Sequence, residues 1–399
     1  MARTGINIQV SNTVMGSPAQ VNANTMLVMI GAKAETGGNM PFKLDTSYML
    51  RSAEEATEVL GLTEANNAAL IKEINDFYAP KSGINNSGTI LWVCGRASAF
   101  TKDIGFILDT VVNGFEYRPR TILVSCDPSK AAVAQTADPA SLQAFNDLLY
   151  ANGFATAMVT CADVFSRDDI ITGDLADMSK LLSPMVGVVA VTDVQGARAC
   201  VGKVGGYLAS LSVGTSIGDV SLGAFATQMY LIDGTIASGA VTFKNTPCSS
   251  LTLTEANALG DLQYIFARTR PPQNGVYFND GATAAEATTA LSTLENARTI
   301  ASMVDDLRSF LNPYLNTKVP VDNAGNINST YKNVVQDNAQ STVIQPYIDN
   351  GDISNARISI EALNGDFLGT RTWKVTLEIL DAATLRWVEG YVFYVKNLE

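Results

Sequence analysis

The chain contains no histidine among its 399 residues. This absence excludes Ser-His-Asp and Cys-His nucleophilic sites, and it removes the commonest metal ligand and the usual neutral-pH general base. The cysteines show no CxxC spacing, and three of them close apolar runs, so we expect buried free thiols. They are Cys94, Cys126, Cys161, Cys200 and Cys248. We therefore expect no catalytic residue, no metal and no cofactor, and the chain is predicted not to be an enzyme, although carboxylate, Lys or Tyr chemistry stays formally open.

Charge is also scarce. Charged residues make up 17% of the chain, the formal net charge is −12, and no basic cluster is present. A phosphate backbone requires a concentrated positive face, so we expect no nucleic-acid partner. No apolar run approaches the ~20 residues that span a bilayer, and the start MARTGINIQVSN lacks an export signal. We expect assembly in the bacterial cytoplasm without membrane insertion. The low charge fits either a surface covered by other subunits or an Ala/Thr/Asn-rich one.

Apolar strand-like runs alternate with helix-like segments from residue 25 to 274. Each run is nearly continuous in Val, Ile and Leu, as in strands that are covered on both faces. This alternation predicts an α/β domain with a largely parallel sheet. The expected strands are 26–32, 89–95, 121–127, 154–161, 186–193 and 228–233. The expected helices are 52–61, 66–79, 139–153 and 196–212, and the Gly-rich VGKVGGY in the last of these fits a small helix face packed on a sheet better than a phosphate loop.

The character of the sequence changes after residue 274. A long helix over roughly 283–312 is predicted from one apolar stripe, and it ends at Asn312-Pro313. A short helix near 331–349 and strands over 357–363 and 372–380 follow. The helix stripe consists of Leu291, Leu294, Ile300, Val304, Leu307 and Leu311.

Both chain ends have the pattern of strands. In the N-terminal arm, residues 1–24, Ile6, Ile8 and Val10 alternate with Asn7 and Gln9. The C-terminal arm, residues 385–399, is bulky on both faces, which makes it an aggregation edge unless it is covered. It either closes a sheet of its own chain or adds to a neighbour's sheet. The side chains expected to make these inter-subunit contacts are Ile6, Ile8, Val10, Trp387, Val388, Tyr391, Val392, Phe393, Tyr394 and Val395.

Three segments resemble contractile tail sheath proteins, which occur in contractile phages and related injection machines. In SAEEATEVLGLTEANNAALIKEINDFYAPKSGINNSGTILWVCGRA, a Ser-acidic helix ending in Leu-Gly precedes a helix ending in Phe77 and Tyr78, a loop and an apolar strand. In GVYFNDGATAAEATTALSTLENARTIASMVDDLRSFLNPYLNTKV, a strand precedes a long helix around Arg298, Thr299 and Ile300. The closing pair of strands is the third similarity.

The resemblance implies that residues 25–274 form the outer α/β domain and that residues 275–384 form a sheath-type inner α/β domain. It also implies N- and C-terminal β arms that add strands to neighbouring subunits. It also implies a helical homo-oligomer of stacked hexameric rings around an inner tail tube protein, together with baseplate and tail terminator proteins. The location would be a virion tail or another contractile particle. A helix near the chain end faces the tube in such proteins. Here its residues would be Lys332, Val335, Gln336 and Gln340.

The predicted function is that of a sheath subunit that polymerises around the tube and contracts to drive it through a target envelope. An α/β ligand-binding protein or an enzyme using carboxylate or Lys chemistry is the first alternative, and it requires a pocket at the carboxyl ends of the strands. A non-contractile tube or shell protein is the second alternative.

Overall fold

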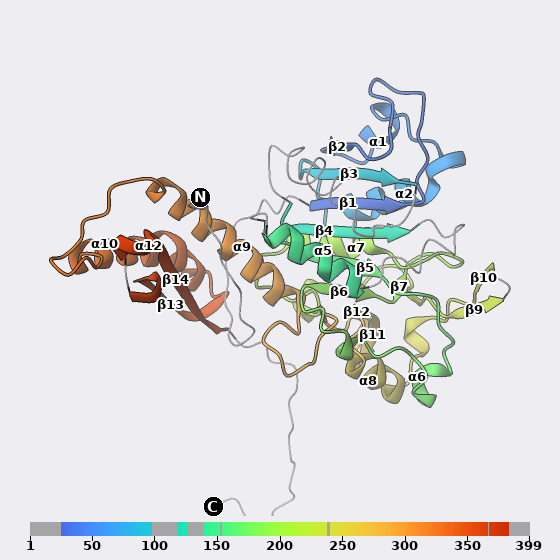
Figure 1. Ribbon diagram of the computed structural model, residues 1–399. Coiled ribbons are helices and arrows are strands. Elements are labelled where there is room, and N and C mark those ends of the chain that lie inside the picture. Colours follow the sequence, from blue (N-terminus) through green and yellow to red (C-terminus); the bar gives the residue numbers. More distant parts are fainter. Residues whose placement is uncertain are drawn as a thin grey trace, which may run out of the picture.

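The computed structural model describes residues 25–97, 119–126, 139–151, 154–237, 240–365 and 367–382. A large α/β body and a smaller body are joined by helix α9 (Leu294–Leu311), which runs from one into the other (Figure 1). The α/β class with a largely parallel sheet is confirmed. Within these ranges, the structure holds no helix of the length and apolar character needed to span a bilayer.

The large body is built around a six-stranded sheet with the order β2-β3-β1-β4-β5-β6. Its neighbours pair in parallel, except that the edge strand β2 runs antiparallel to β3. The five parallel strands are buried along their whole length, which explains why they stand out as continuous apolar runs. The bounds are β1 (Thr25–Ile30), β2 (Ser47–Leu50), β3 (Leu91–Arg96), β4 (Thr121–Cys126), β5 (Ala157–Cys161) and β6 (Val186–Val189).

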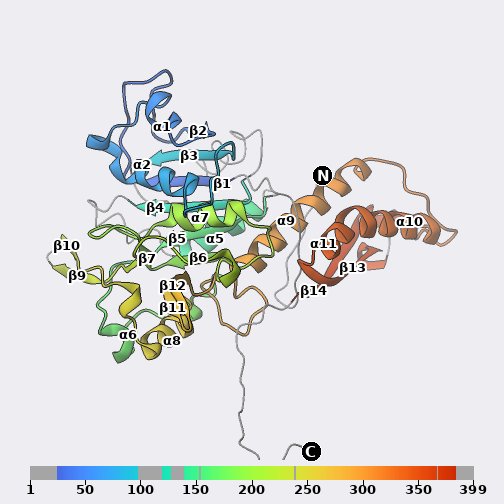
Figure 2. The same cartoon turned by 180° about the vertical axis from the view of Figure 1, so that it is seen from behind.

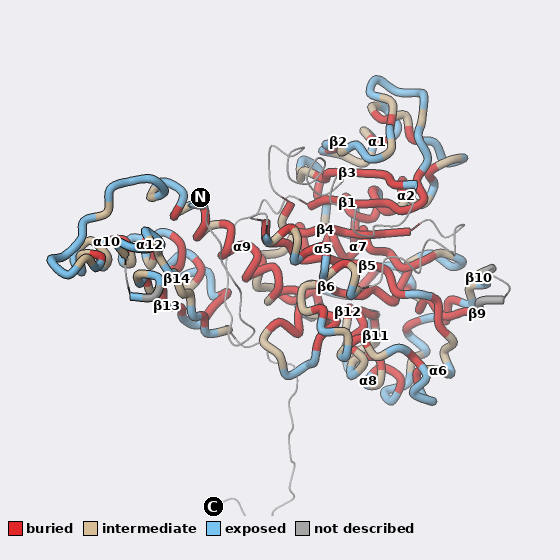
Figure 3. The backbone as a smooth tube through the Cα atoms, in the orientation of Figure 1, coloured by how far each residue is buried: buried red, intermediate tan, exposed pale blue. Residues whose placement is uncertain are grey.

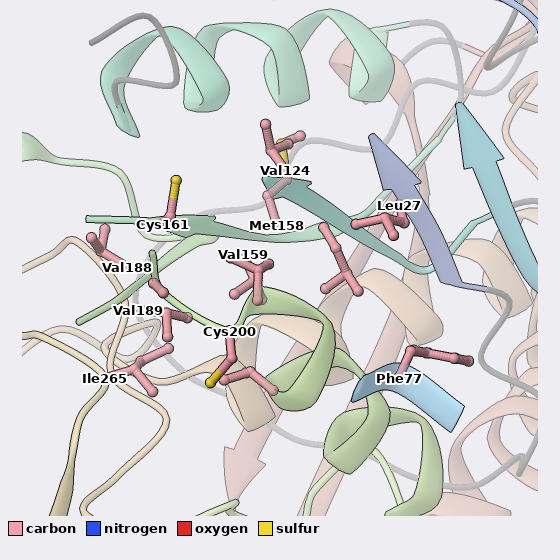
Figure 4. Close-up of a cluster of buried hydrophobic side chains, with 14 of the residues drawn as sticks. Leu27, Phe77, Val124, Met158, Val159, Cys161, Val188, Val189, Cys200 and Ile265 are labelled. Carbon is pink, nitrogen blue, oxygen red and sulfur yellow. The ribbon is translucent and has the colours of Figure 1, made fainter. Parts of the chain in front are cut away.

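Helices cover both faces of this sheet. Helices α2 (Glu64–Tyr78) and α7 (Val201–Ser210) pack together on one face, which is in front in Figure 2. Helix α5 (Pro139–Ala151) covers the other face. Figure 4 shows buried side chains of the sheet, such as Val124, Val159 and Val189, between the helical layers. All five cysteines are free and buried, as the sequence predicts. The predicted helix over 52–61 shortens to the single turn α1 (Glu55–Glu58).

Three glycines of α7 allow its close packing. Gly202 and Gly206 lie against the backbone of α2, and Gly205 lies against the Leu123 side chain in β4. A methyl group at any of the three would overlap these neighbours. The prediction that VGKVGGY forms a helix is therefore confirmed. Its small face was predicted to pack on the sheet, but only Gly205 does so, since Gly202 and Gly206 pack on helix α2.

We expect Gly206→Ala to lower the free energy of unfolding by about 1–3 kcal/mol, the usual cost of overpacking a core. The added methyl group would overlap the carbonyl oxygen of Phe77. Gly260→Ala in helix α8 (Leu253–Asp261) is the matched control, because there the methyl group would meet only the Asn279 amide, at 3.6 Å. Urea unfolding of both variants tests this, and an equal loss in both would contradict the packing argument.

A cluster of charged side chains joins α2 to α7. The Lys72 ammonium pairs with the carboxylate of Asp76 and lies 2.8 Å from that of Asp193. The Lys203 ammonium lies 2.5 Å from the other carboxylate oxygen of Asp193. Because all four groups are largely shielded from water, each charge depends on its partners.

Short elements complete the large body. Two-stranded pairs are formed by β7 (Val191–Thr192) with β8 (Tyr230–Leu231), β9 (Gly234–Ala237) with β10 (Ala240–Phe243), and β11 (Ala267–Arg270) with β12 (Gln273–Phe278). The short helices are α6 (Asp169–Thr172), η2 (Met178–Leu181), η3 (Val220–Leu222) and η4 (Cys248–Ser250).

Helix α9 starts later than predicted. It begins at Leu294 rather than near residue 283, so the predicted start is wrong. Residues 283–293 are held by non-helical hydrogen bonds instead. Within the segment, Thr283 Oγ1 donates to the carbonyl oxygen of Leu291 at 2.5 Å, and from outside it the Ser183 N–H donates to the carbonyl oxygen of Ala284 at 2.7 Å. The helix ends at Leu311, as predicted, and the turn η5 (Asn312–Tyr314) follows.

Arg298 attaches α9 to the large body. Its side chain is 1% exposed, and its guanidinium donates to the carbonyl oxygens of Leu208 and Leu211 at 2.6 and 3.3 Å. These carbonyls lie at the C-terminal end of α7, where helical partners are missing and a cation is favoured. Burial lowers the pKa of Arg298 to about 10, so the side chain keeps its charge at neutral pH.

The smaller body packs a helical run against a β-hairpin. The predicted helix near 331–349 consists of α10 (Ser329–Ala339), a π-helical segment η6 (Gln340–Ile344) and α11 (Gln345–Asp349). The hairpin strands are β13 (Ile353–Ala362) and β14 (Trp373–Asp381), with η7 (Leu363–Gly365) and α12 (Phe367–Thr370) between them. Its core includes Met303, Leu307 and Leu311 of α9 together with Val343, Ile344, Tyr347, Ile358 and Ile379.

The two cores meet along α9, which is buried over most of its length (Figure 3). Leu294 belongs to the core of the large body, and Leu307 to that of the smaller body. Strand β12 crosses the predicted boundary between residues 274 and 275, and its Phe278 packs in the large body. The division into domains stays a prediction, and the two arms lie outside the described residues.

Candidate assembly surface

The β13–β14 hairpin is a separate two-stranded sheet within the described part of the chain. Its strands pair antiparallel, from Ala356 opposite Ile379 to Ala362 opposite Trp373. The helical layer of α10 and α11 covers one face of the hairpin, and Ile358 and Ile379 are buried there. A two-stranded sheet presents an edge of backbone N–H and C=O groups on each side.

Side-chain amides from α10 and η6 occupy the edge of β13. The Gln336 amide nitrogen donates to the Ile358 carbonyl oxygen at 3.3 Å, and its oxygen accepts from the Ile360 N–H at 3.4 Å. The Gln340 amide nitrogen donates to the Ala356 carbonyl oxygen at 3.2 Å. Ladder hydrogen bonds alternate along an antiparallel pair. Ala356, Ile358 and Ile360 therefore point their backbone N–H and C=O groups away from β14.

Among the residues that the structure describes, the outer edge of β14 is open. The residues opposite Ile360, Ile358 and Ala356 are Val375, Leu377 and Ile379, so their backbone groups also point away from the ladder. Within the described ranges, no donor or acceptor pairs with these outward groups. The two edges of the hairpin are therefore chemically different.

The faces of β14 also differ. Val375, Leu377 and Ile379 pack against the core of the smaller body, whereas Lys374 and Glu378 are exposed on the opposite face. Glu378 pairs there with Arg357 of β13. Both members of that pair are more than half exposed, so it contributes little to stability.

The predicted inter-subunit contacts lie outside the described residues. This holds for Ile6, Ile8 and Val10 in the N-terminal arm and for all seven residues from Trp387 to Val395 in the C-terminal arm. Their role in assembly stays a prediction.

The four residues predicted to face a tube do not form one exposed face of the helix. Val335 is 2% exposed and turns inward, and Gln336 and Gln340 bond to β13, while Lys332 is half-buried. The residues of α10 that face outward are Asn333, Val334, Asp337 and Asn338. The spacing of Val335 and Ala339, one helical turn apart, is the sequence signal that marks the inward face.

Exposed apolar side chains concentrate on the smaller body. Of the 12 large apolar side chains that are exposed among the described residues, half follow α9, although this part is a minor share of the chain. These residues are Leu315, Val321, Val334, Leu363, Leu368 and Leu380.

A cavity of about 250 Å³ lies between α5 and α9 in the large body. Its lining includes Asn146, Tyr150, Thr156, Met185 and Ile300. Thr156 and Met185 immediately precede β5 and β6, so the cavity lies at the amino ends of these strands, whereas parallel α/β sheets bind ligands at the carboxyl ends. No group of three or more His, Cys, Asp or Glu side chains among the described residues is arranged to hold a metal ion.

The fold defined by these two bodies is that of tail sheath proteins. A chain of the anti-feeding prophage (AFP) baseplate superposes with a TM-score of 0.57 at 10% identity, over 100% of both chains. The sheath tail protein from Listeria innocua gives 0.52 at 11% identity, over 94% of this chain and 93% of that one. The sheath tail protein from Desulfitobacterium hafniense gives 0.52 at 9% identity, over 94% and 100%.

In sequence, the chain belongs to the DUF2586 family, whose N-terminal domain model matches residues 3–282. No curated protein matches the chain in sequence.

Proposed function

We propose that the chain is the structural subunit of a contractile tail sheath. It polymerises helically as stacked rings around an inner tube, on a baseplate and below a terminator, and shortens to drive the tube through a target envelope. It is assembled in the bacterial cytoplasm and acts without catalysis. The observation that carries the proposal is the tail sheath fold, which extends over 94–100% of the chain.

The hairpin supports the polymerisation step. An open β14 edge accepts a strand from another chain, and the arms provide strands of the required pattern. Roughly six ladder hydrogen bonds at ~0.5–1.5 kcal/mol each give ~3–9 kcal/mol. Ordering an arm costs ~1–2 kcal/mol per residue, which cancels much of this gain. Single arms therefore bind weakly, and two arms per subunit hold the lattice by multivalency.

Electron microscopy of the purified chain tests the proposal. We expect tubes or stacked rings, and two lattice lengths of the same polymer before and after mild denaturant. A polymer with one lattice state under all conditions would favour the non-contractile tube. A small oligomer of fixed size at every concentration in light scattering would contradict polymerisation and favour the ligand-binding or enzymatic alternative.

A further inference from the structure

Two cysteines end neighbouring strands of the large sheet. Cys126 is the last residue of β4, and Cys161 is the last residue of β5. Because β4 and β5 run parallel with Val124 opposite Thr160, the two cysteines are offset by one residue in the register. Strands about 4.8 Å apart and a rise of about 3.3 Å per residue put their Cα atoms about 6 Å apart. This separation lies within the range of roughly 4.4–6.8 Å that a disulfide spans.

The two thiols meet on one side of the sheet. Figure 4 shows the sulfur of Cys161 on the same side as Val124, toward α5. Side chains alternate along a strand, so Cys126, two residues after Val124, points to that side as well. The Cys126 thiol donates a hydrogen bond to the sulfur of Cys161. By contrast, the thiols of Cys94 and Cys200 bond to backbone carbonyl oxygens.

Arg198 supplies a positive charge to this pair. It lies in the segment that leads into α7, and it is only 6% exposed. Within the ranges that the structure describes, its Nε and Nη1 atoms have no hydrogen-bond partner. The hydrogen bond from Cys126 and the charge of Arg198 lower the pKa of Cys161, although burial opposes this. The same hydrogen bond, together with burial, raises the pKa of Cys126. Cys161 is therefore the thiolate of the pair, and Cys126 stays a thiol.

Access to solvent differs among the five cysteines. Cys161 is 7% exposed, whereas Cys126 is 1% exposed and the other three are 0% exposed. Thiolate character and access together decide which cysteine an oxidant attacks first. Both favour Cys161, and Cys126 lies beside it as the thiol that can complete a disulfide.

We propose that Cys126 and Cys161 form a redox pair, which a hydroperoxide converts to a disulfide while Arg198 balances the charge of the reacting thiolate. This site goes beyond the proposed function, since it requires neither polymerisation nor a tube. The disulfide ties β4 to β5 and closes the loop that contains α5.

The reaction has two steps. The Cys161 thiolate attacks one oxygen of the peroxide, the O–O bond breaks, and the departing hydroxide takes a proton from solvent to become water. The sulfur of Cys126 then attacks the resulting sulfenic acid, the S–O bond breaks, and the hydroxyl group leaves with the Cys126 proton as a second water. The sulfur pair loses two electrons, and the peroxide is reduced to two waters.

A thiol count after treatment with hydrogen peroxide tests the pair. In the full chain we expect the free thiols, measured with Ellman's reagent in denaturant, to fall from five to three and to return to five with dithiothreitol. Peptide mapping after alkylation should identify the bond between Cys126 and Cys161. Cys248→Ser is the matched control, which keeps the pair and should lose two thiols as well. In Cys126→Ser, Cys161 should stop at the sulfenic acid, which dimedone traps. A count that stays at five, or a disulfide between other cysteines, would overturn the proposal.

Variants of Arg198 test the role of the charge. We expect Arg198→Gln to slow the loss of thiols about tenfold, because less of Cys161 is then ionised, and Arg198→Lys to restore most of the rate. Circular dichroism verifies the fold of both variants. Equal rates in the glutamine variant and the unsubstituted chain would show that Arg198 is not the counterion, whatever the thiol count.

Discussion

Deleting residues 1–20 is expected to leave a folded chain that no longer polymerises. The deletion ends before β1, which starts at Thr25, so the buried core is unchanged. Loss of even ~3 kcal/mol per contact raises the concentration needed for polymerisation by about 100-fold. Analytical ultracentrifugation and electron microscopy measure this, with circular dichroism to verify the fold. Deleting residues 386–399 should have the same effect if the second arm also links subunits.

Two sets of point variants distinguish the effect of the apolar pattern of the N-terminal arm from the effect of its length. The triple variant Ile6→Asn, Ile8→Asn and Val10→Asn removes the apolar face and should behave like the deletion. The double variant Asn7→Ser and Gln9→Ser changes only the polar face and should polymerise like the unsubstituted chain. Truncated chains that still form tubes would contradict arm exchange, and equal loss in both sets of point variants would contradict docking by the apolar face.

The buried parallel strands are predictable because their residues are apolar at every position along the sequence. A strand covered on both faces must be apolar at every position, so runs such as MLVMI identify β1 without tertiary information. The edge strand β2 was missed because Ser47–Leu50 has only four residues, with alternate exposure. A short, half-exposed strand forms because it pairs with its neighbour, here β3, and its composition alone does not reveal it.

The start of α9 and the edge of β13 depend on contacts distant in sequence. Residues 283–293 are rich in Ala and Thr and fit a helix locally, but the bond between Ser183 and Ala284 and the bridge between Ala282 and Thr293 hold the backbone in another path. Gln336 and Gln340 likewise read as surface residues of a helix. Only the placement of that helix across the hairpin shows that their amides bind backbone groups of β13.

Glu73 makes the stability of the large body dependent on pH. The carboxylate lies between α2 and α7, where it accepts hydrogen bonds from Ser125 Oγ at 2.7 Å and from the Gly202 N–H. Burial raises its pKa from 4.5 to about 7, although Lys72 opposes the shift. The folded chain therefore binds a proton that the unfolded chain releases between pH 4.5 and 7. Stability contributed by the neutral form is present below pH 4.5 and is lost as pH rises to about 7.

We therefore expect Glu73→Gln to stabilise the chain at pH 8 by up to about 3 kcal/mol, since one pKa unit corresponds to 1.36 kcal/mol. A glutamine can accept from the Gly202 N–H and donate to Ser125 Oγ, so both contacts survive without a charge. Urea unfolding between pH 4.5 and 8 should show the decline with pH in the unsubstituted chain and a flatter profile in the variant. Burial also raises the pKa of Asp76, so its titration lowers stability in the same direction as pH rises.

Asp193→Asn is the control, because its expected effect on stability has the opposite sign. Burial acts against ionisation of Asp193, but Lys72 and Lys203 hold its pKa at about 2, so its charge stabilises the folded chain above pH 3.8. Removing that charge leaves two shielded ammonium groups with weakened pairing and should destabilise the chain at pH 7. Destabilisation by Glu73→Gln at pH 8 would contradict this account. It would show that Lys72 needs the Glu73 carboxylate as a partner, so that Glu73 belongs to the charged cluster of Lys72, Asp76, Asp193 and Lys203.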